Sequence, residues 1–126
     1  MNVEQVEETC KEAEKMICYQ ARLDSFGSAW PLSNPTPEQL ASAGFYYTGN
    51  EDEVMSPFMM KTISGWEEDD DPMAEATKRK AKNAYLSRKW SPKDCLTKKT
   101  ADMTLNEWYR MSALFMESKM AYIIQV

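Results

Sequence analysis

The sequence predicts an α+β domain, in which a small three-stranded antiparallel sheet is surrounded by short helices and has a helical extension at each end. Three observations favour this fold class. The chain has 126 residues, 43% of them hydrophobic, which suffices for one small core. A tyrosine-rich segment between Gly44 and Gly49 has strand character. Both ends of the chain contain stretches rich in apolar residues at helical spacing.

The N-terminal segment, residues 1–18, is predicted to form an amphipathic helix. Apolar side chains recur there at intervals of three and four residues and so share one helical face: Val3, Val6, Cys10, Ala13 and Ile17. Glutamate and lysine occupy the other faces. We expect the apolar face to pack against the chain's own body, with a partner helix as the alternative.

A loop and a short helix follow. Residues 27–34 contain Trp30-Pro31 and are expected to form a loop. Thr36 can cap a helix that starts at Pro37, and Gln39 stands where its side chain can return the capping bond. This helix is expected to end near Gly44.

The sheet is predicted from three short strands. Residues 45–48 form the first, and the turn over 49–52 leads back into a second strand over 54–58. A third strand over 62–64 completes the sheet. Asp71-Pro72 then caps and starts a helix that runs to about residue 82.

Residues 91–103 form a polar linker, and a final helix is predicted over 104–126. Thr104-Leu105-Asn106-Glu107 has the pattern of a capping box. Apolar side chains wrap more than one face of this helix, so it must be buried on several sides. The body of the chain is small, and we therefore expect a partner helix rather than internal packing alone. The predicted interface consists of Leu105, Trp108, Met111, Leu114, Phe115 and Tyr122.

Composition argues against several function classes. The chain has no histidine, and its three cysteines, at positions 10, 18 and 95, have no metal-finger spacing. Neither a nucleophile elbow nor a phosphate loop occurs, so we do not expect an enzyme. No apolar run reaches the length of a membrane span, and no signal segment is recognised. The odd number of cysteines favours a reducing intracellular compartment.

Charge is distributed unevenly. Residues 67–71 are five consecutive acids, whereas residues 78–99 contain nine basic residues and one acid. The basic stretch has no nucleic-acid recognition motif, so we interpret it as a solvated surface and expect no specific nucleic-acid binding. The acidic run is either a solvated turn that favours a helix N-terminus or part of a binding site.

Several motifs, in order, resemble the BIR domain, the baculovirus inhibitor-of-apoptosis repeat. The resemblance covers about residues 19–88, so a BIR-like domain is expected over 19–90. It rests on Arg22-Leu23-Asp24-Ser25-Phe26, Trp30-Pro31, the segment 37–49 (PEQLASAGFYYTG), Gly65-Trp66-Glu67 and Asp69-Asp70-Asp71-Pro72. The single repeat and the C-terminal helix are similar to the survivin-like group. That group implies an adaptor in a complex of the chromosomal passenger type, found in nucleus and cytoplasm, whose helices bind protein partners. A homodimer is a further possibility.

The chain departs from the family at the zinc site. The four ligand positions of the family fall on Ser56, Met59, Ala76 and Asn83. We therefore expect no metal and no other cofactor. Structural zinc contributes on the order of 10 kcal/mol to the folding of small domains, so another contribution must replace it. An apolar plug of Met55, Met59, Met60 and Ala76 is one expected contribution, and a stabilising partner is another.

The resemblance also implies a groove that binds the free N-terminus of a peptide. Asp70 would pair with the ammonium group, and Trp66 and Ile63 would form the pocket for the first side chain. The strand from Lys61 to Ser64 would bind the peptide backbone, and Lys61 and Arg79 would contact a phosphate on a histone-like tail. Ser64 replaces an acid of the family. Two alternatives stay open: a degenerate domain that acts only as a scaffold, and an inhibitor-like binder of caspase or antagonist N-termini.

Overall fold

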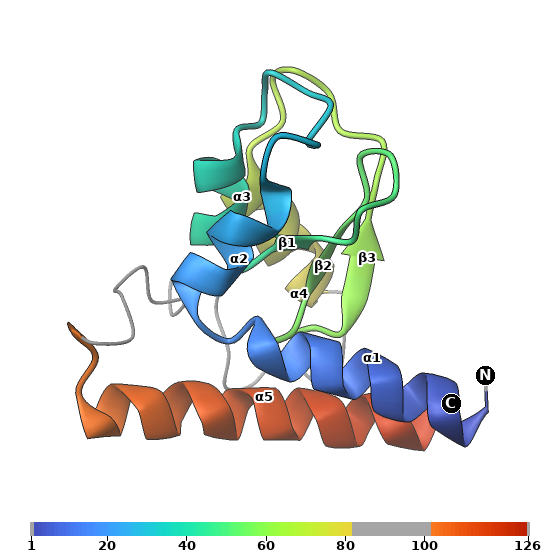
Figure 1. Cartoon of the computed structure of the whole chain (residues 1–126), viewed down its shortest axis with the longest axis vertical. Helices are drawn as coiled ribbons and strands as arrows, with labels where there is room; N and C mark the ends of the chain where they lie inside the picture. Colours follow the sequence, from blue (N-terminus) through green and yellow to red (C-terminus); the bar gives the residue numbers. More distant parts are fainter. Residues whose placement is uncertain (1, 82–101, 126) are drawn as a thin grey trace.

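The structure is a computed structural model, and it describes residues 2–81 and 102–125. The described residues form five helices and three strands (Figure 1): α1 (Val3–Lys15), α2 (Tyr19–Phe26), α3 (Pro37–Ser42), β1 (Tyr46–Tyr47), β2 (Val54–Ser56), β3 (Lys61–Ile63), α4 (Pro72–Ala81) and α5 (Leu105–Gln125). The predicted α+β class is confirmed. Most of the predicted linker over 91–103, and Asn83, lie outside the described residues.

The sheet has the order β1-β2-β3, and both pairs of neighbouring strands are antiparallel. Tyr46 pairs with Met55, and Val54 pairs with both Tyr47 and Ile63, so β2 is the central strand. All residues of β1 and β2 are buried. β3 is an edge strand whose first two residues are exposed, and no other strand of the described residues pairs with its outer edge.

α1 and α5 lie side by side along the base of the molecule and run in opposite directions (Figure 1). α1 begins at a capping box, in which the Gln5 N–H donates to Asn2 Oδ1 at 2.9 Å and the Asn2 N–H donates to Gln5 Oε1 at 3.0 Å. Its residues Cys10 and Ala13 are buried in the core, as is Ile17 just beyond it. The expected packing of the N-terminal helix within the chain is therefore observed.

α2 connects the base to the rest of the body, mainly through Arg22. This arginine is buried, although its side chain is charged. Its Nε donates to the Ala41 carbonyl at 3.0 Å, and its Nη1 donates to the Ile17 carbonyl at 2.7 Å. The guanidinium also lies 5.9 Å from the ring centre of Tyr19 and 5.8 Å from that of Phe58. One side chain thus joins α2, α3 and the turn that follows β2.

Both predicted capping boxes after α1 are present. At α3, the Gln39 N–H donates to Thr36 Oγ1 at 3.2 Å, and the Thr36 N–H donates to Gln39 Oε1 at 2.9 Å. At α5, the corresponding bonds join Thr104 and Glu107 at 2.9 and 3.1 Å. α5 is attached to the body by the Ser118 hydroxyl, which donates to the Phe58 carbonyl. No helix in the described part of the chain combines the length and apolarity of a membrane span.

Candidate functional site

A cavity of about 270 Å³ opens where β3 leaves the sheet and α4 begins. β3 contributes Ile63 to its lining, the segment between β3 and α4 contributes five residues, and α4 contributes Glu75 and Arg79. The residues that line it are Ile63, Ser64, Gly65, Trp66, Glu67, Asp70, Glu75 and Arg79. We call this cavity the groove.

The turn at Gly65 places Trp66 in the groove. Gly65 has a φ of 74°, in the left-handed region that glycine adopts without strain. The following Trp66 N–H donates to Asp52 Oδ2 at 2.9 Å, which ties the turn to the hairpin loop. The Trp66 ring packs edge-on against Phe45, with ring centres 5.9 Å apart and planes at 74°. Trp66 is only 7% exposed, so it forms a fixed wall.

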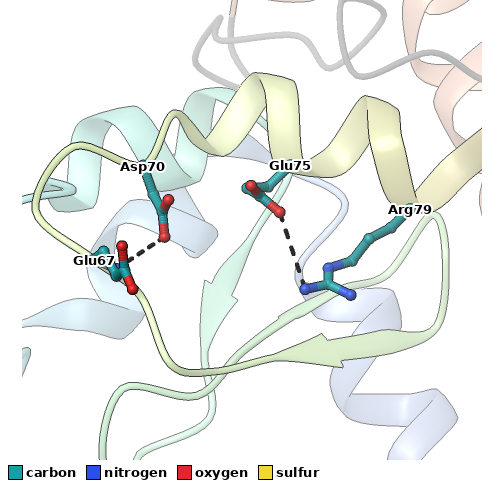
Figure 2. Close-up of polar contacts among 4 residues, drawn as sticks. All are labelled: Glu67, Asp70, Glu75 and Arg79. Atoms are coloured by element: carbon teal, nitrogen blue, oxygen red, sulfur yellow. Dashed lines mark hydrogen bonds and ion pairs between the residues drawn. The ribbon is translucent and has the colours of Figure 1, made fainter.

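One end of the groove is negatively charged. The Glu67 N–H donates to Asp70 Oδ2 at 2.8 Å, and the Asp70 N–H donates to the Glu67 carbonyl at 3.1 Å (Figure 2). The carboxylates of Glu67, Asp69 and Asp70 come within 4.8 Å of one another. Three carboxylates this close give this end of the groove a negative potential that favours a cation over an anion.

At the other end of the groove, Arg79 is the only cation among the described residues that line it. Arg79 Nη2 lies 4.0 Å from Glu75 Oε2, one helical turn earlier on α4 (Figure 2). Arg79 Nε and Trp66 Nε1 are both buried, and neither donates to an acceptor among the described residues. Buried donors are satisfied in nearly all native structures. Two such donors at one cavity are available to the acceptors of a ligand or of water.

Five of the six residues predicted to bind a peptide line the groove together: Ile63, Ser64, Trp66, Asp70 and Arg79. Lys61 lies on β3 but is exposed and does not line the cavity. The prediction missed Gly65, Glu67 and Glu75. The spacing of Glu75 four residues before Arg79 was a usable signal, because residues at this spacing are neighbours on a helix.

The positions of the family's zinc ligands do not suit a metal. Ser56, Met59 and Ala76 are all buried. Ala76 has no ligand atom, and the Met59 thioether is a neutral, soft donor that zinc sites do not use. Ser56 Oγ already accepts hydrogen bonds from the Phe58 and Met59 N–H groups, each at 3.2 Å. Asn83 lies outside the described residues. The described donors therefore do not fit zinc.

The turn that would hold the metal is instead packed and hydrogen-bonded. Met60 has a φ of 52°, and its N–H donates to the Ser56 carbonyl at 2.7 Å. The four residues expected to form an apolar plug, Met55, Met59, Met60 and Ala76, are all buried in the single core cluster. Their burial supports the expectation that side-chain packing replaces the metal.

Ser56→Ala is expected to lower the free energy of unfolding by about 1–3 kcal/mol, because two buried N–H groups lose their acceptor. Urea denaturation followed by tryptophan fluorescence measures the change. Ser64→Ala is the matched control, since Ser64 is exposed and its loss should change the stability by less than about 0.5 kcal/mol. Equal stabilities of the two variants would show that the Ser56 hydroxyl does not support the turn.

The helix α5 divides into a covered and an open face. Of the six residues predicted to contact a partner, Met111, Leu114 and Phe115 are buried against the chain's own body, and Tyr122 is half-buried. Leu105 and Trp108 are exposed. Further large apolar side chains on α5 that the prediction did not select are also exposed: Tyr109, Met116, Met120, Ile123 and Ile124.

Comparisons with known proteins agree with the geometry. The family model "BIR: Inhibitor of Apoptosis domain" matches residues 22–87. "Baculoviral IAP repeat-containing protein 5.1" of Xenopus tropicalis is 38% identical over 109 residues, which make up 82% of this chain and 62% of the frog protein. "Chromosomal passenger complex protein bir1" of Schizosaccharomyces pombe is 41% identical over 70 residues, 48% of this chain and 7% of the yeast protein.

A solved structure supports the same assignment. The crystal structure of the autoinhibited dIAP1-BIR1 domain aligns with a TM-score of 0.52 and 25% identity, covering 79% of this chain and 92% of that one. The chain spans about 61–62% of the length of the three frog 5.1 relatives that it matches. Because the family model matches more than half of the sequence, the chain belongs to the BIR family, the inhibitor-of-apoptosis domains.

Proposed function

We propose that this chain is a survivin-like adaptor that binds the N-terminus of a peptide tail in its groove and binds protein partners through α5. It has no catalytic role in this proposal. The observation that carries the groove function is the pair of buried, unsatisfied donors, Arg79 Nε and Trp66 Nε1, at the same cavity as the carboxylates of Glu67 and Asp70. Such a cavity suits a ligand with a cationic end followed by an anionic group.

The acidic end suits the ammonium group of a free N-terminus. Asp70 is held in place by its bond from the Glu67 N–H, which uses one carboxylate oxygen. The other oxygen is then available to accept from an ammonium group. Trp66 and Ile63 give an apolar wall for a small first side chain such as alanine. The exposed edge of β3 offers backbone groups to an extended peptide.

The basic end suits an anion that follows the N-terminus by a few residues. Arg79 Nη2 lies 4.0 Å from Glu75 Oε2, which is a long contact for an ion pair. A phosphate oxygen can therefore replace Glu75 as the partner of Arg79. Lys61 is exposed on β3 and long enough to approach a phosphate from the strand side. Ser64 is neutral, so this wall has no acid to attract an arginine in the peptide.

The relatives favour a role in a multiprotein complex. The name of the fission yeast relative assigns that protein to the chromosomal passenger complex. We extend this assignment to the present chain as part of the proposal, with nucleus and cytoplasm as its location during cell division. The exposed apolar face of α5 is the surface that would join it to other subunits.

Titration of a phosphorylated Ala-Arg-Thr-Lys tail tests the groove. We expect Asp70→Asn to weaken binding by about 10- to 100-fold, because the ammonium loses its charged acceptor. Acetylation of the peptide N-terminus should have at least as large an effect. Asp24→Asn is the matched control: it removes the same charge from an exposed position on α2, which does not line the groove. Isothermal titration calorimetry measures all four affinities.

Two other outcomes would each favour a different function. Equal affinities for the wild type, Asp70→Asn and the acetylated tail would make the chain a scaffold that acts through its helices alone. Tighter binding of an Ala-Val-Pro peptide than of the phosphorylated tail would favour the inhibitor-like function, which the similarity to dIAP1-BIR1 makes the second candidate. Arg79 argues against that second candidate, because a charged side chain is a poor wall for a proline ring.

A further inference from the structure

A second cavity, of about 360 Å³, lies where α1 meets the first two strands of the sheet. Three of its residues belong to α1, and the others belong to β1, β2 and the residue that follows β1. The residues that line it are Glu8, Thr9, Glu12, Tyr46, Tyr47, Thr48 and Met55. None of them lines the groove. We call this second cavity the α1 cavity.

Two carboxylates stand at the α1 cavity. Glu8 and Glu12 are one helical turn apart, so their side chains are neighbours on α1 and repel each other. Glu8 forms no ion pair with any described residue. Glu12 Oε2 lies 3.7 Å from Lys15 Nζ in an exposed contact, which contributes little. Exposed glutamates at this spacing also occur on ordinary solvated helices, so the other residues of the cavity determine its chemistry.

The two threonines of the α1 cavity can only accept further hydrogen bonds. Thr9 Oγ1 donates to the Gln5 carbonyl at 2.8 Å, and Thr48 Oγ1 donates to the Glu53 carbonyl at 3.1 Å. A carbonyl only accepts, so each threonine has used its single hydroxyl hydrogen. The Thr48 N–H also donates to the Glu53 carbonyl, at 3.2 Å. An anion would therefore find no free donor on these groups.

Tyr46 adds a buried acceptor to the same cavity. Its side chain is only 4% exposed, and its hydroxyl donates to Met55 Sδ at 3.2 Å. A thioether only accepts, so the phenol oxygen keeps its own acceptor capacity, and no described group donates to it. Burial, and then the negative charge of Glu12, raise the pKa of the Tyr46 phenol, which therefore stays neutral. A buried oxygen without a donor, close to a carboxylate, suits a cationic donor.

We propose that the α1 cavity binds an arginine side chain of a protein partner. A guanidinium has five N–H donors and no acceptor, which matches a cavity whose polar side chains only accept. Its planar fork can bond to Glu8 and Glu12 together, and it is more weakly hydrated than an ammonium group. α1 contains five glutamates and two lysines, so its field attracts a basic segment. The inference goes beyond the proposed groove function, because it concerns an internal side chain rather than a free N-terminus.

NMR titration of the ¹⁵N-labelled chain with acetyl-Gly-Arg-Gly-amide tests the inference. The blocked N-terminus prevents this peptide from using the acidic end of the groove. The amide signals of Thr9, Tyr46 and Thr48 should shift with a Kd of about 1 mM, whereas those of Ser64 and Gly65 should stay in place. A peptide with citrulline, which has the shape of arginine without its charge, should bind at least about tenfold more weakly. A lysine peptide should bind at least about threefold more weakly.

Variants separate a built site from a general acidic surface. Glu8→Gln and Glu12→Gln should each weaken binding by about two- to fivefold. Tyr46→Phe keeps the ring, removes the acceptor oxygen and should weaken binding by about two- to fivefold. Glu14→Gln is the matched control, since Glu14 is exposed on α1 but does not line the cavity, and its affinity should stay within about 1.5-fold.

Four results would each overturn the inference. They are unshifted amides around the α1 cavity, equal affinities for the arginine and citrulline peptides, tighter binding of the lysine peptide, and an effect of Glu14→Gln as large as that of Glu8→Gln. The amide spectrum of each variant also shows whether it is folded. Titration of the same samples with the phosphorylated tail reports the groove separately, so either site can fail without the other.

Discussion

Arg22→Ala is expected to lower the free energy of unfolding by about 3–5 kcal/mol, a large share of the stability of a small domain. Three carbonyl groups lose their donor in this variant: Ala41 and Ile17, which accept in buried hydrogen bonds at 3.0 and 2.7 Å, and Met16, which accepts in a part-buried one at 3.2 Å. Each buried acceptor without a donor costs about 1–3 kcal/mol. The aliphatic part of the side chain also leaves a cavity among the rings of Tyr19 and Phe58.

Urea denaturation followed by tryptophan fluorescence measures this loss. Lys15→Ala is the control, because Lys15 is an exposed cation whose contact with Glu12, at 3.7 Å, is open to solvent. Its removal should change the stability by less than about 0.5 kcal/mol. A loss of under about 1 kcal/mol for Arg22→Ala would show that the three carbonyls find other donors, or water, without the arginine.

The elements that could be predicted from the sequence are those specified by local contacts. Thr36 with Gln39, and Thr104 with Glu107, form capping boxes over four residues, and the structure contains both. The apolar stripe of α1 could also be predicted, because the helical period of 3.6 residues in its apolar side chains can be recognised without knowledge of distant contacts. These features require no knowledge of how the chain packs.

The helix α2 was not predicted, and its environment explains why. Its N-cap residue, Cys18, makes no side-chain capping bond. The helix is held by Arg22, whose acceptors lie on other segments, up to 19 residues away in the sequence. Long-range contacts of this kind leave no periodic pattern. The α+β class could be stated without α2, but the connection between α1 and α3 could not.

The residues of the groove also divide into those that the local sequence predicts and those that only the packing of the chain brings together. Trp66 and Asp70 are close together in the sequence, within motifs that resemble the family, so their proximity followed from the resemblance. The spacing of Glu75 could associate it with Arg79, but whether this face of α4 lines the groove depends on how α4 is rotated relative to β3, which only the packed structure determines. The inner face of α5 is a similar case: Met111 and Phe115 could not be separated from the exposed Met116 until the body of the chain was in place.

Met59→Ala is expected to lower the free energy of unfolding by about 2–5 kcal/mol, because it opens a cavity in the core. Met59 is 2% exposed and belongs to the core cluster at a position where the family has a zinc ligand. The control is Met116→Ala. It is the same chemical change at a side chain that is 48% exposed, and it should cost less than about 0.5 kcal/mol.

A zinc chelator distinguishes packing from metal binding in the same samples. A domain held by zinc loses on the order of 10 kcal/mol when its metal is removed, so its melting temperature falls steeply. Here Ser56 Oγ already accepts hydrogen bonds from two N–H groups, and the Ala76 side chain has no atom that can bind a metal. The chelator should therefore leave the melting temperature unchanged. Lower stability after chelation, together with little loss of stability in Met59→Ala, would show that a metal rather than side-chain packing stabilises the turn. Chelator resistance combined with a large loss for Met59→Ala would mean that buried side chains now stabilise the turn.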